Sequence, residues 1–107
     1  MKNFRTFNLA VEFYRQTKCL KLPTPLRDQL ARAALSIPLN LAEGRGKPTL
    51  KDQIRFFNIA MGSLRECEAI LEIADQANTQ LGKALDTLGA HLHNLIRHAA
   101  KSPVAEN

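Results

Sequence analysis

Two short polar segments interrupt apolar helical runs in this chain, and they carry the side chains best suited to chemistry. The segments are residues 36–44, SIPLNLAEG, and residues 62–66, GSLRE. Glu43 and Glu66 could act as a carboxylate pair in general acid–base catalysis. However, the sequence offers no nucleophile, metal-ligand cluster or phosphate-binding loop to accompany them. We therefore predict a protein that is not an enzyme and uses no cofactor.

The same polar residues also have a structural interpretation. A buried charge is costly unless it is paired and hydrogen-bonded, so polar side chains within apolar helical runs favour one shared network between helices. In this interpretation Glu66 pairs with Arg32, and Gly62 allows the two helices to approach closely. The predicted members of the network are Arg32, Asn40, Glu43, Ser63 and Glu66. The sequence leaves open whether this network lies within one subunit or between subunits.

The three histidines are poorly spaced for a metal site. His91 and His93 are two residues apart and point to nearly opposite faces of a helix, whereas His91 and His98 are about 10 Å apart along its axis. We therefore expect ordinary histidines and no bound metal. The glycine-rich run at residues 44–46 follows a helix and not a strand, so it predicts a turn instead of a phosphate-binding loop.

The composition predicts one all-α domain. The chain has 107 residues, of which 45% are hydrophobic and only 6% aromatic, and helix-forming residues predominate. Cys19 and Cys67 have no partner at a metal-binding spacing, so we expect buried thiols in a reducing compartment. No apolar run reaches the ~18 residues of a membrane span, and charges interrupt the N-terminal run that a signal peptide would need. These features predict a cytoplasmic protein with no membrane partner.

Four periodic segments, separated by short breakers, predict four helices. We expect them over residues 4–22, from Pro25 to Gly44 or Gly46, over residues 50–78, and from Thr79 onward. One of the two glycines should take the left-handed conformation that ends the second helix. Pro38 should kink that helix, and Thr49 should cap the third.

Short connections between these helices favour an up-down-up-down antiparallel four-helix bundle. The bundle should occupy residues 1–101, and residues 102–107 should form a flexible C-terminal tail. The fourth helix has the most regular seam, because its apolar residues alternate at spacings of four and three. These residues are Leu81, Leu85, Leu88, Leu92, Leu95 and Ala99.

The first and third predicted helices each carry two apolar stripes, although a small bundle needs only one stripe per helix. Surplus apolar surface often marks an interface, so we expect a homo-oligomer. The interface residues expected on the third helix are Phe56, Ile59, Ile70 and Ile73. The alternative interpretation is that the second stripe only widens the face that covers the core.

The net charge of +5 should gather at one end of the bundle. An antiparallel arrangement brings the N-terminus, the connection between the second and third helices, and the C-terminus together. The basic residues at this end, which are the predicted nucleic-acid-binding residues, are Lys2, Arg5, Arg45, Lys47, Lys51, Arg55, Arg97 and Lys101; the acidic ones are Glu43, Asp52 and Glu106. Such an end suits a phosphate backbone. Alternatively, it is simply a lysine-rich, solvated surface, and no aromatic residue is expected among the bases to stack on nucleobases.

Residues 32–44, RAALSIPLNLAEG, and residues 56–66, FFNIAMGSLRE, resemble a family signature in their order and spacing. The family comprises four-helix-bundle proteins encoded in intervening sequences of bacterial 23S ribosomal RNA genes, and it is similar to the accessory variability determinant of diversity-generating retroelements. The resemblance implies a barrel-like homo-oligomer, usually a pentamer, with no known enzymatic activity and a nucleic-acid-binding role. Leu39 and Leu41 stand where the family often has isoleucine.

Two hypotheses about function follow from these features. The first is a nucleic-acid-binding protein whose oligomeric basic rim contacts RNA or DNA, alongside the reverse-transcriptase-type partner that the retroelement resemblance implies. The second is a protein-interaction scaffold that docks an acidic or apolar protein. Binding through phosphates must weaken with salt, because counterions are released, and this dependence separates the two hypotheses. The ligand, the biological process and the ring size do not follow from the residues themselves.

Overall fold

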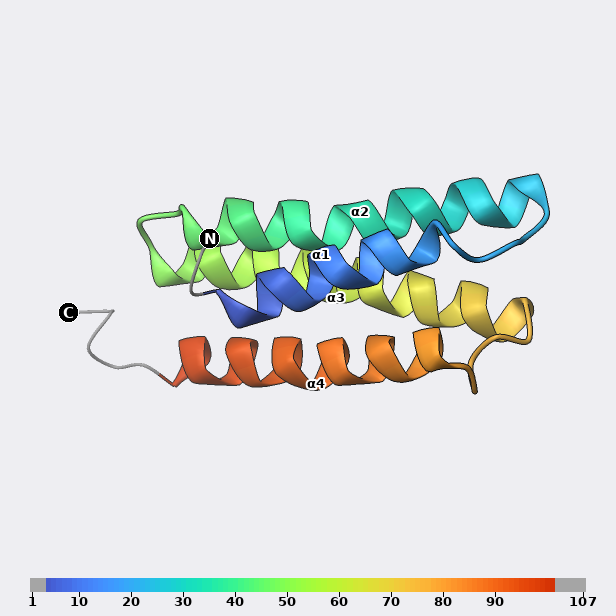
Figure 1. The fold of residues 1–107 in the computed structure, drawn as a ribbon. Helices are drawn as coiled ribbons and strands as arrows, with labels where there is room; N and C mark the ends of the chain where they lie inside the picture. Colours follow the sequence, from blue (N-terminus) through green and yellow to red (C-terminus); the bar gives the residue numbers. More distant parts are fainter. Residues whose placement is uncertain (1–3, 102–107) are drawn as a thin grey trace.

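The computed structural model describes residues 4–101, which form four α-helices and, within that range, no strand. The helices are α1 (Arg5–Thr17), α2 (Thr24–Arg45), α3 (Leu50–Ile73) and α4 (Gln80–Ala100). The prediction of an all-α protein with four helices is confirmed (Figure 1). The predictions made for Lys2 and for the C-terminal tail at residues 102–107 lie outside the described residues.

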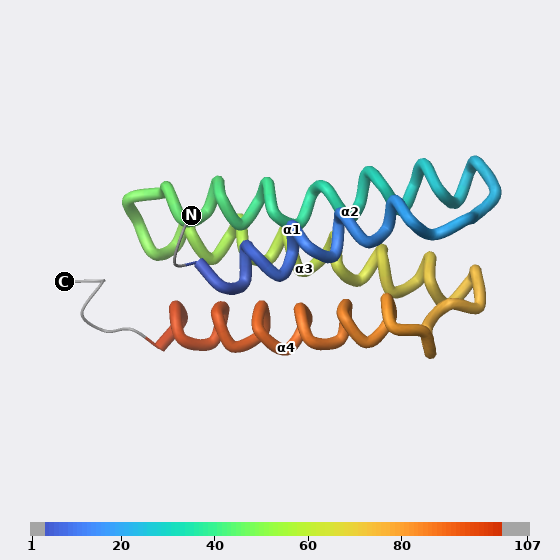
Figure 2. Tube along the Cα trace, viewed as in Figure 1, coloured from blue at the N-terminus to red at the C-terminus, as the bar shows by residue number. Residues whose placement is uncertain are grey.

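The four helices lie lengthwise beside one another (Figure 1). The start of α1, the α2–α3 connection and the end of α4 lie at one end of the molecule, and the α1–α2 and α3–α4 connections lie at the other (Figure 2). Helix α2 packs most extensively against α3, while α1 contacts both α2 and α4, and α3 contacts α4. This arrangement decides which charged side chains share an end.

The core is built from leucines, alanines and a few larger side chains on the facing sides of the helices. Leu81, Leu85, Leu88 and Leu92 of α4 are buried, as the seam spacing predicts. From the other helices, the residues that are almost fully buried include Phe13, Leu30, Ile37, Leu41, Cys67 and Leu71. Pro38 is also buried, inside an α2 that continues on both sides of it. No helix within residues 4–101 combines the length and apolar character needed to cross a membrane.

Helix α1 ends at Thr17, earlier than the predicted Leu22. Its last turn tightens, because the N–H groups of Lys18 and Cys19 donate to carbonyl groups three residues back, on Arg15 and Gln16. The chain then crosses to Thr24, where α2 begins one residue before the predicted Pro25. Cys19 lies in this connection and is exposed, so the prediction that it is buried is wrong.

The two glycines at the end of α2, Gly44 and Gly46, do not have the predicted role of a left-handed cap. Gly46 ends α2 with a φ of −82°, so the expected left-handed glycine cap is wrong; its N–H instead bonds to the carbonyls of Ala42 and Glu43. Gly44 is needed for packing, since an added Cβ would lie 2.8 Å from a ring carbon of Phe57. A methyl group cannot fit there unless the aromatic ring moves.

Helix α3 ends at Ile73 and not at the predicted Asn78. Asp75 has a φ of 57°, and the Gln76 N–H donates to the carbonyl of Leu71 at 2.7 Å, which is the hydrogen bond of a Schellman C-terminus. A left-handed residue, which the sequence predicted as a glycine after the second helix, therefore occurs after the third helix and is an aspartate. Thr49 and Thr79 cap α3 and α4 through their hydroxyl oxygens, so the predicted cap of the third helix is confirmed.

Candidate functional site

Basic side chains from every helix gather at the end that holds the α2–α3 connection. We call this set of described residues the basic end: Arg5, Arg45, Lys47, Lys51, Arg55, Arg97 and Lys101. All except the half-buried Lys47 are exposed. Within residues 4–101, the acidic side chains at this end are Glu43 and Asp52, and Glu43 forms an ion pair with Lys47 at 3.1 Å. Helix ends from distant parts of the sequence thus combine into one positive surface.

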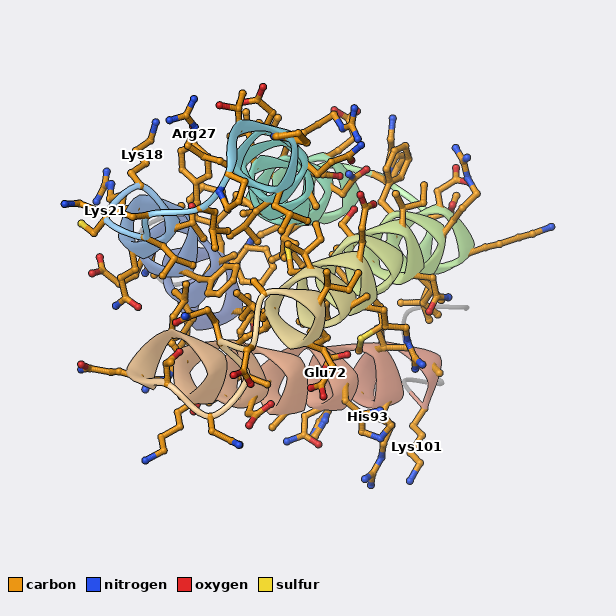
Figure 3. All side chains as sticks on the ribbon, turned by 90° about the vertical axis from the view of Figure 1, so that its right-hand side faces the viewer. Lys18, Lys21, Arg27, Glu72, His93 and Lys101 are labelled. Atoms are coloured by element: carbon orange, nitrogen blue, oxygen red, sulfur yellow. The ribbon has the colours of Figure 1, made fainter. Side chains whose placement is uncertain are left out.

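The opposite end carries both signs of charge. Figure 3 faces this end, where Lys18, Lys21 and Arg27 extend into solvent from one side and Glu72 lies on another. Asp28, Asp75, Asp86 and Lys83 also belong to the helix ends and connections located there. Arg27 lies 3.9 Å from Asp28, with both side chains largely exposed. The positive charge is therefore localised at one end of the bundle and balanced at the other.

Aromatic rings lie against three of the basic side chains, contrary to the expectation from the sequence. The Lys47 Nζ and the Arg55 guanidinium carbon lie 5.0 and 4.6 Å from the centre of the Phe56 ring. The Arg45 guanidinium carbon lies 4.5 Å from the centre of the Phe4 ring. These cation–π contacts restrict the bases to defined positions. The Phe4 contact joins the start of α1 to the end of α2, which the order of residues along the chain does not show.

The predicted polar network is formed only in part. Ser63 of α3 lies 2.7 Å from Ser36 of α2, hydroxyl to hydroxyl, and Asn40 donates from Nδ2 to the Ser36 carbonyl and hydroxyl oxygens at 2.8 and 3.0 Å. Asn40 and Ser63 are thus brought together, with Ser36 as the link that the prediction omitted. The place of Ser36 in the polar segment was the only sign in the sequence that it contacts α3. A serine hydroxyl can equally bond to its own helix, so the sequence did not show which partner Ser36 has.

The charged members of the predicted network do not join these residues. Arg32, Glu43 and Glu66 are exposed, and the Arg32 guanidinium bonds instead to Gln29 of its own helix. No ion pair joins Arg32 to Glu66 among residues 4–101, so the prediction of a buried pair within one subunit is wrong. Gly62 has no atom within 4 Å of an added Cβ, so the prediction of a close approach at this glycine is also wrong. These charged side chains are exposed, so they can reach water and need no partner between α2 and α3.

The predicted oligomer interface is also divided. Ile70 is only 6% exposed and belongs to the core, so its assignment to the interface is wrong, and Phe56 is half-buried. Ile59 and Ile73 are exposed, as are two leucines of α2 that the prediction omitted. We call these four the apolar strip: Leu35, Leu39, Ile59 and Ile73, exposed by 40%, 59%, 42% and 71%. Leu39 and Ile59 lie about one helical turn from the serine contact on α2 and α3, so the strip follows the outer side of this helix pair.

Cys67 and His91 have defined surroundings in the bundle. Burial, aided by the nearby Glu66 and Glu68 carboxylates, raises the pKa of Cys67 to about 12, so its thiol is protonated near neutral pH. His91 donates from Nδ1 to the Thr87 carbonyl and accepts at Nε2 from Arg5. Within residues 4–101, no group of three or more His, Cys, Asp or Glu side chains is placed to hold a metal ion.

One of three comparisons with known proteins found a match. The family model described as 23S rRNA-intervening sequence protein matches residues 4–101, which spans all four helices. No curated protein and no solved structure matches the chain. The family resemblance of the two polar segments is therefore confirmed by a match over the whole described chain.

Proposed function

The chain belongs to the 23S rRNA-intervening sequence protein family, and we propose that it is a non-enzymatic, oligomeric protein that binds RNA or DNA through its basic end. The observation that supports this proposal is the localisation of positive charge on one end, contributed by α1, α2, α3 and α4 together. The remaining charges of the described chain are balanced. A polyanion is the ligand class that such a surface attracts.

The arrangement of the basic end suits phosphate groups more than an acidic protein side chain. Arg5, Lys51 and Arg97 are exposed and lie on three different helices, so the positive surface extends across several helix ends, as a polymer of phosphates requires. Backbone contacts carry little sequence information. We therefore expect binding to unrelated sequences with similar affinity.

The proposal includes an assembly of up-down-up-down antiparallel bundles into a barrel-like homo-oligomer, a pentamer in keeping with the family resemblance. The apolar strip supplies surface that a monomer leaves exposed. In a cyclic assembly the basic ends would form one rim. A reverse-transcriptase-type partner and a cytoplasmic location complete the proposal.

A pair of triple variants tests the binding of phosphates. Replacing Lys51, Arg97 and Lys101 with glutamine should weaken binding to generic RNA and duplex DNA, and should reduce the slope of log affinity against log salt by about 0.7 to 0.9 for each phosphate that the variant no longer neutralises. The binding can be measured by fluorescence anisotropy across a range of salt concentrations. All three side chains are exposed.

The matched control removes the same charge from the opposite end by replacing Lys18, Lys21 and Lys83, which are also exposed, with glutamine. It should leave both affinity and salt slope nearly unchanged. Equal decreases in affinity in the two variants would show that binding depends on net charge alone. If the unaltered protein shows no salt-sensitive binding, the basic end is not a nucleic-acid site.

The apolar strip favours a second candidate function, a scaffold that docks an apolar or acidic protein partner. Leu39 and Ile73 are more than half exposed, and such residues gain most when another surface covers them. A protein that stays monomeric and does not bind nucleic acid would support this alternative.

A further inference from the structure

A recess of about 380 Å³ opens at the basic end, where the start of α1 and the end of α2 meet α3 and the last turns of α4. This volume lies within the range of small-molecule sites in proteins. Leu50, Phe57 and Leu95 give it an apolar surface. Phosphate groups do not require an apolar surface. Charge attraction alone therefore does not explain an apolar recess among basic side chains.

An arginine stands at this recess with its position fixed by an aromatic ring. Arg45 lines the recess, is exposed, and lies against Phe4 at 4.5 Å from the guanidinium carbon to the ring centre. Phe4 is only 5% exposed and packs edge-on against Phe57, with 6.4 Å between ring centres. The buried Phe4 ring therefore holds the Arg45 guanidinium group in place, and solvent can reach Arg45. Unpaired bases stack on guanidinium planes and on aromatic rings in nucleic-acid-binding proteins.

The polar side chains of the recess offer hydrogen-bond acceptors. His98 donates from Nδ1 to the Asn94 carbonyl at 2.9 Å, which leaves Nε2 of the neutral ring as an acceptor. Gln53 donates from Nε2 to the Lys47 carbonyl at 2.9 Å, and its Oε1 can accept. Amino groups on the edges of cytosine and adenine are donors that match such acceptors.

We infer that this recess receives one unpaired base of the strand whose phosphates the basic end binds, so that single-stranded nucleic acid is the preferred ligand. The inference rests on the proposed function and adds to it a ligand class and a site. Charge complementarity supports this occupant, because Arg45 lines the recess. The exposed Arg5, Lys51 and Arg97 are each next in sequence to a residue that lines it. A duplex keeps its bases paired and stacked, and extracting one costs energy.

The test compares two single strands that carry the same number of phosphates, an oligocytidylate and an abasic strand of equal length. The unaltered protein should bind the oligocytidylate at least about fivefold more tightly, which is the lower limit for stacking one base. Ala99→Leu should bring this ratio close to one by filling the recess, with the affinity for the abasic strand unchanged. Ala99 lines the recess, and leucine is a strong helix former.

Ala100→Leu is the matched control, because Ala100 is exposed and next in sequence to Ala99. It should keep the preference for the base-bearing strand. Should Ala99→Leu lose its helical circular dichroism signal, Ala99→Val, a smaller aliphatic side chain at the same position in the recess, takes its place. A ratio of one in the unaltered protein, or an unchanged ratio in the filled variant, would overturn the inference while leaving phosphate binding intact. Absence of salt-sensitive binding to both strands would instead reject the proposed function.

Discussion

Gly82→Ala should destabilise the protein because the α3–α4 connection passes directly over this glycine. An added Cβ would lie 2.7 Å from the carbonyl carbon of Ala77 and closer still to its oxygen. Main-chain atoms cannot rotate aside as a side chain can. The connection is further fixed by Thr79, whose hydroxyl donates to the Gln76 carbonyl at 2.6 Å and accepts from the Gly82 N–H at 3.4 Å. The methyl group can fit only if this capping turn moves.

The size of the effect follows from three contributions. Overpacking costs about 1 to 3 kcal/mol, and the clash with main-chain atoms places Gly82→Ala at the upper end of that range. Loss of the Thr79 cap costs about 1 kcal/mol more, whereas alanine gains about 1 kcal/mol over glycine in a helix. We therefore expect the free energy of unfolding to fall by about 3 kcal/mol.

Gly89→Ala is the matched control on the same helix. Its added Cβ would lie 3.6 Å from the nearest side-chain carbon of Leu64, which is an ordinary contact, so the gain in helix propensity should remain. We expect this variant to be as stable as the unaltered protein or more stable, by up to about 1 kcal/mol. Urea denaturation followed by circular dichroism, at one fixed protein concentration, measures both variants. If the two substitutions have equal effects, the close approach of Ala77 does not constrain the fold.

Three further outcomes are expected. Leu39→Glu should shift the protein toward a monomer in light scattering, because a charge would enter the apolar strip; a monodisperse 11.9 kDa species in the unaltered protein would contradict this expectation. Glu66→Ala and Glu68→Ala should each change the free energy of unfolding by under about 1 kcal/mol, since both side chains are exposed, and a much larger decrease for Glu66 would indicate a buried partner in another subunit. A thiol reagent should label the exposed Cys19 but not the buried Cys67 in the folded protein. Because burial raises the folded-state pKa of Cys67 from 9.0 to about 12, the contribution of this thiol to stability should be lost as the pH rises from about 9 to 12. Denaturation across this pH range, with Cys67→Ala as the reference, measures the loss.

Local patterns predicted most of the helical structure. The leucine seam of α4 and the threonine cap of α3 depend on spacing and on short side chains near a helix start, which the sequence shows directly. The helix ends were less predictable. Ending α3 at Ile73 depends on a left-handed aspartate, Asp75, and aspartate adopts this conformation less often than glycine.

The candidate site depends on contacts between distant parts of the chain, so the sequence showed it only in outline. The basic residues were predicted to share one end, and the structure places all but the undescribed Lys2 at the ends of helices there. The recess and the contact of Phe4 with Arg45 need the start of α1 to meet the end of α2. Arg32 and Glu66 were expected to be buried because they lie among apolar runs, yet both lie on the exposed edge of the α2–α3 contact.

Ile73 connects the proposed assembly to the proposed binding, because it belongs to the apolar strip but lies far along α3 from the basic end. A second copy seated on a lengthwise strip would lie beside the first and would leave both basic ends free. Several basic ends on one rim would bind a long strand more tightly than one end alone, because each later binding event is intramolecular.

Ile73→Glu should therefore weaken binding to a long RNA strand while leaving the affinity for a strand that spans only one subunit nearly unchanged. Asn78→Glu adds the same charge in the α3–α4 connection, outside the strip, and serves as the control. Light scattering on the same samples reports whether the assembly has dissociated. If Ile73→Glu yields a monomer that keeps full affinity for the long strand, each basic end binds independently and the rim contributes nothing.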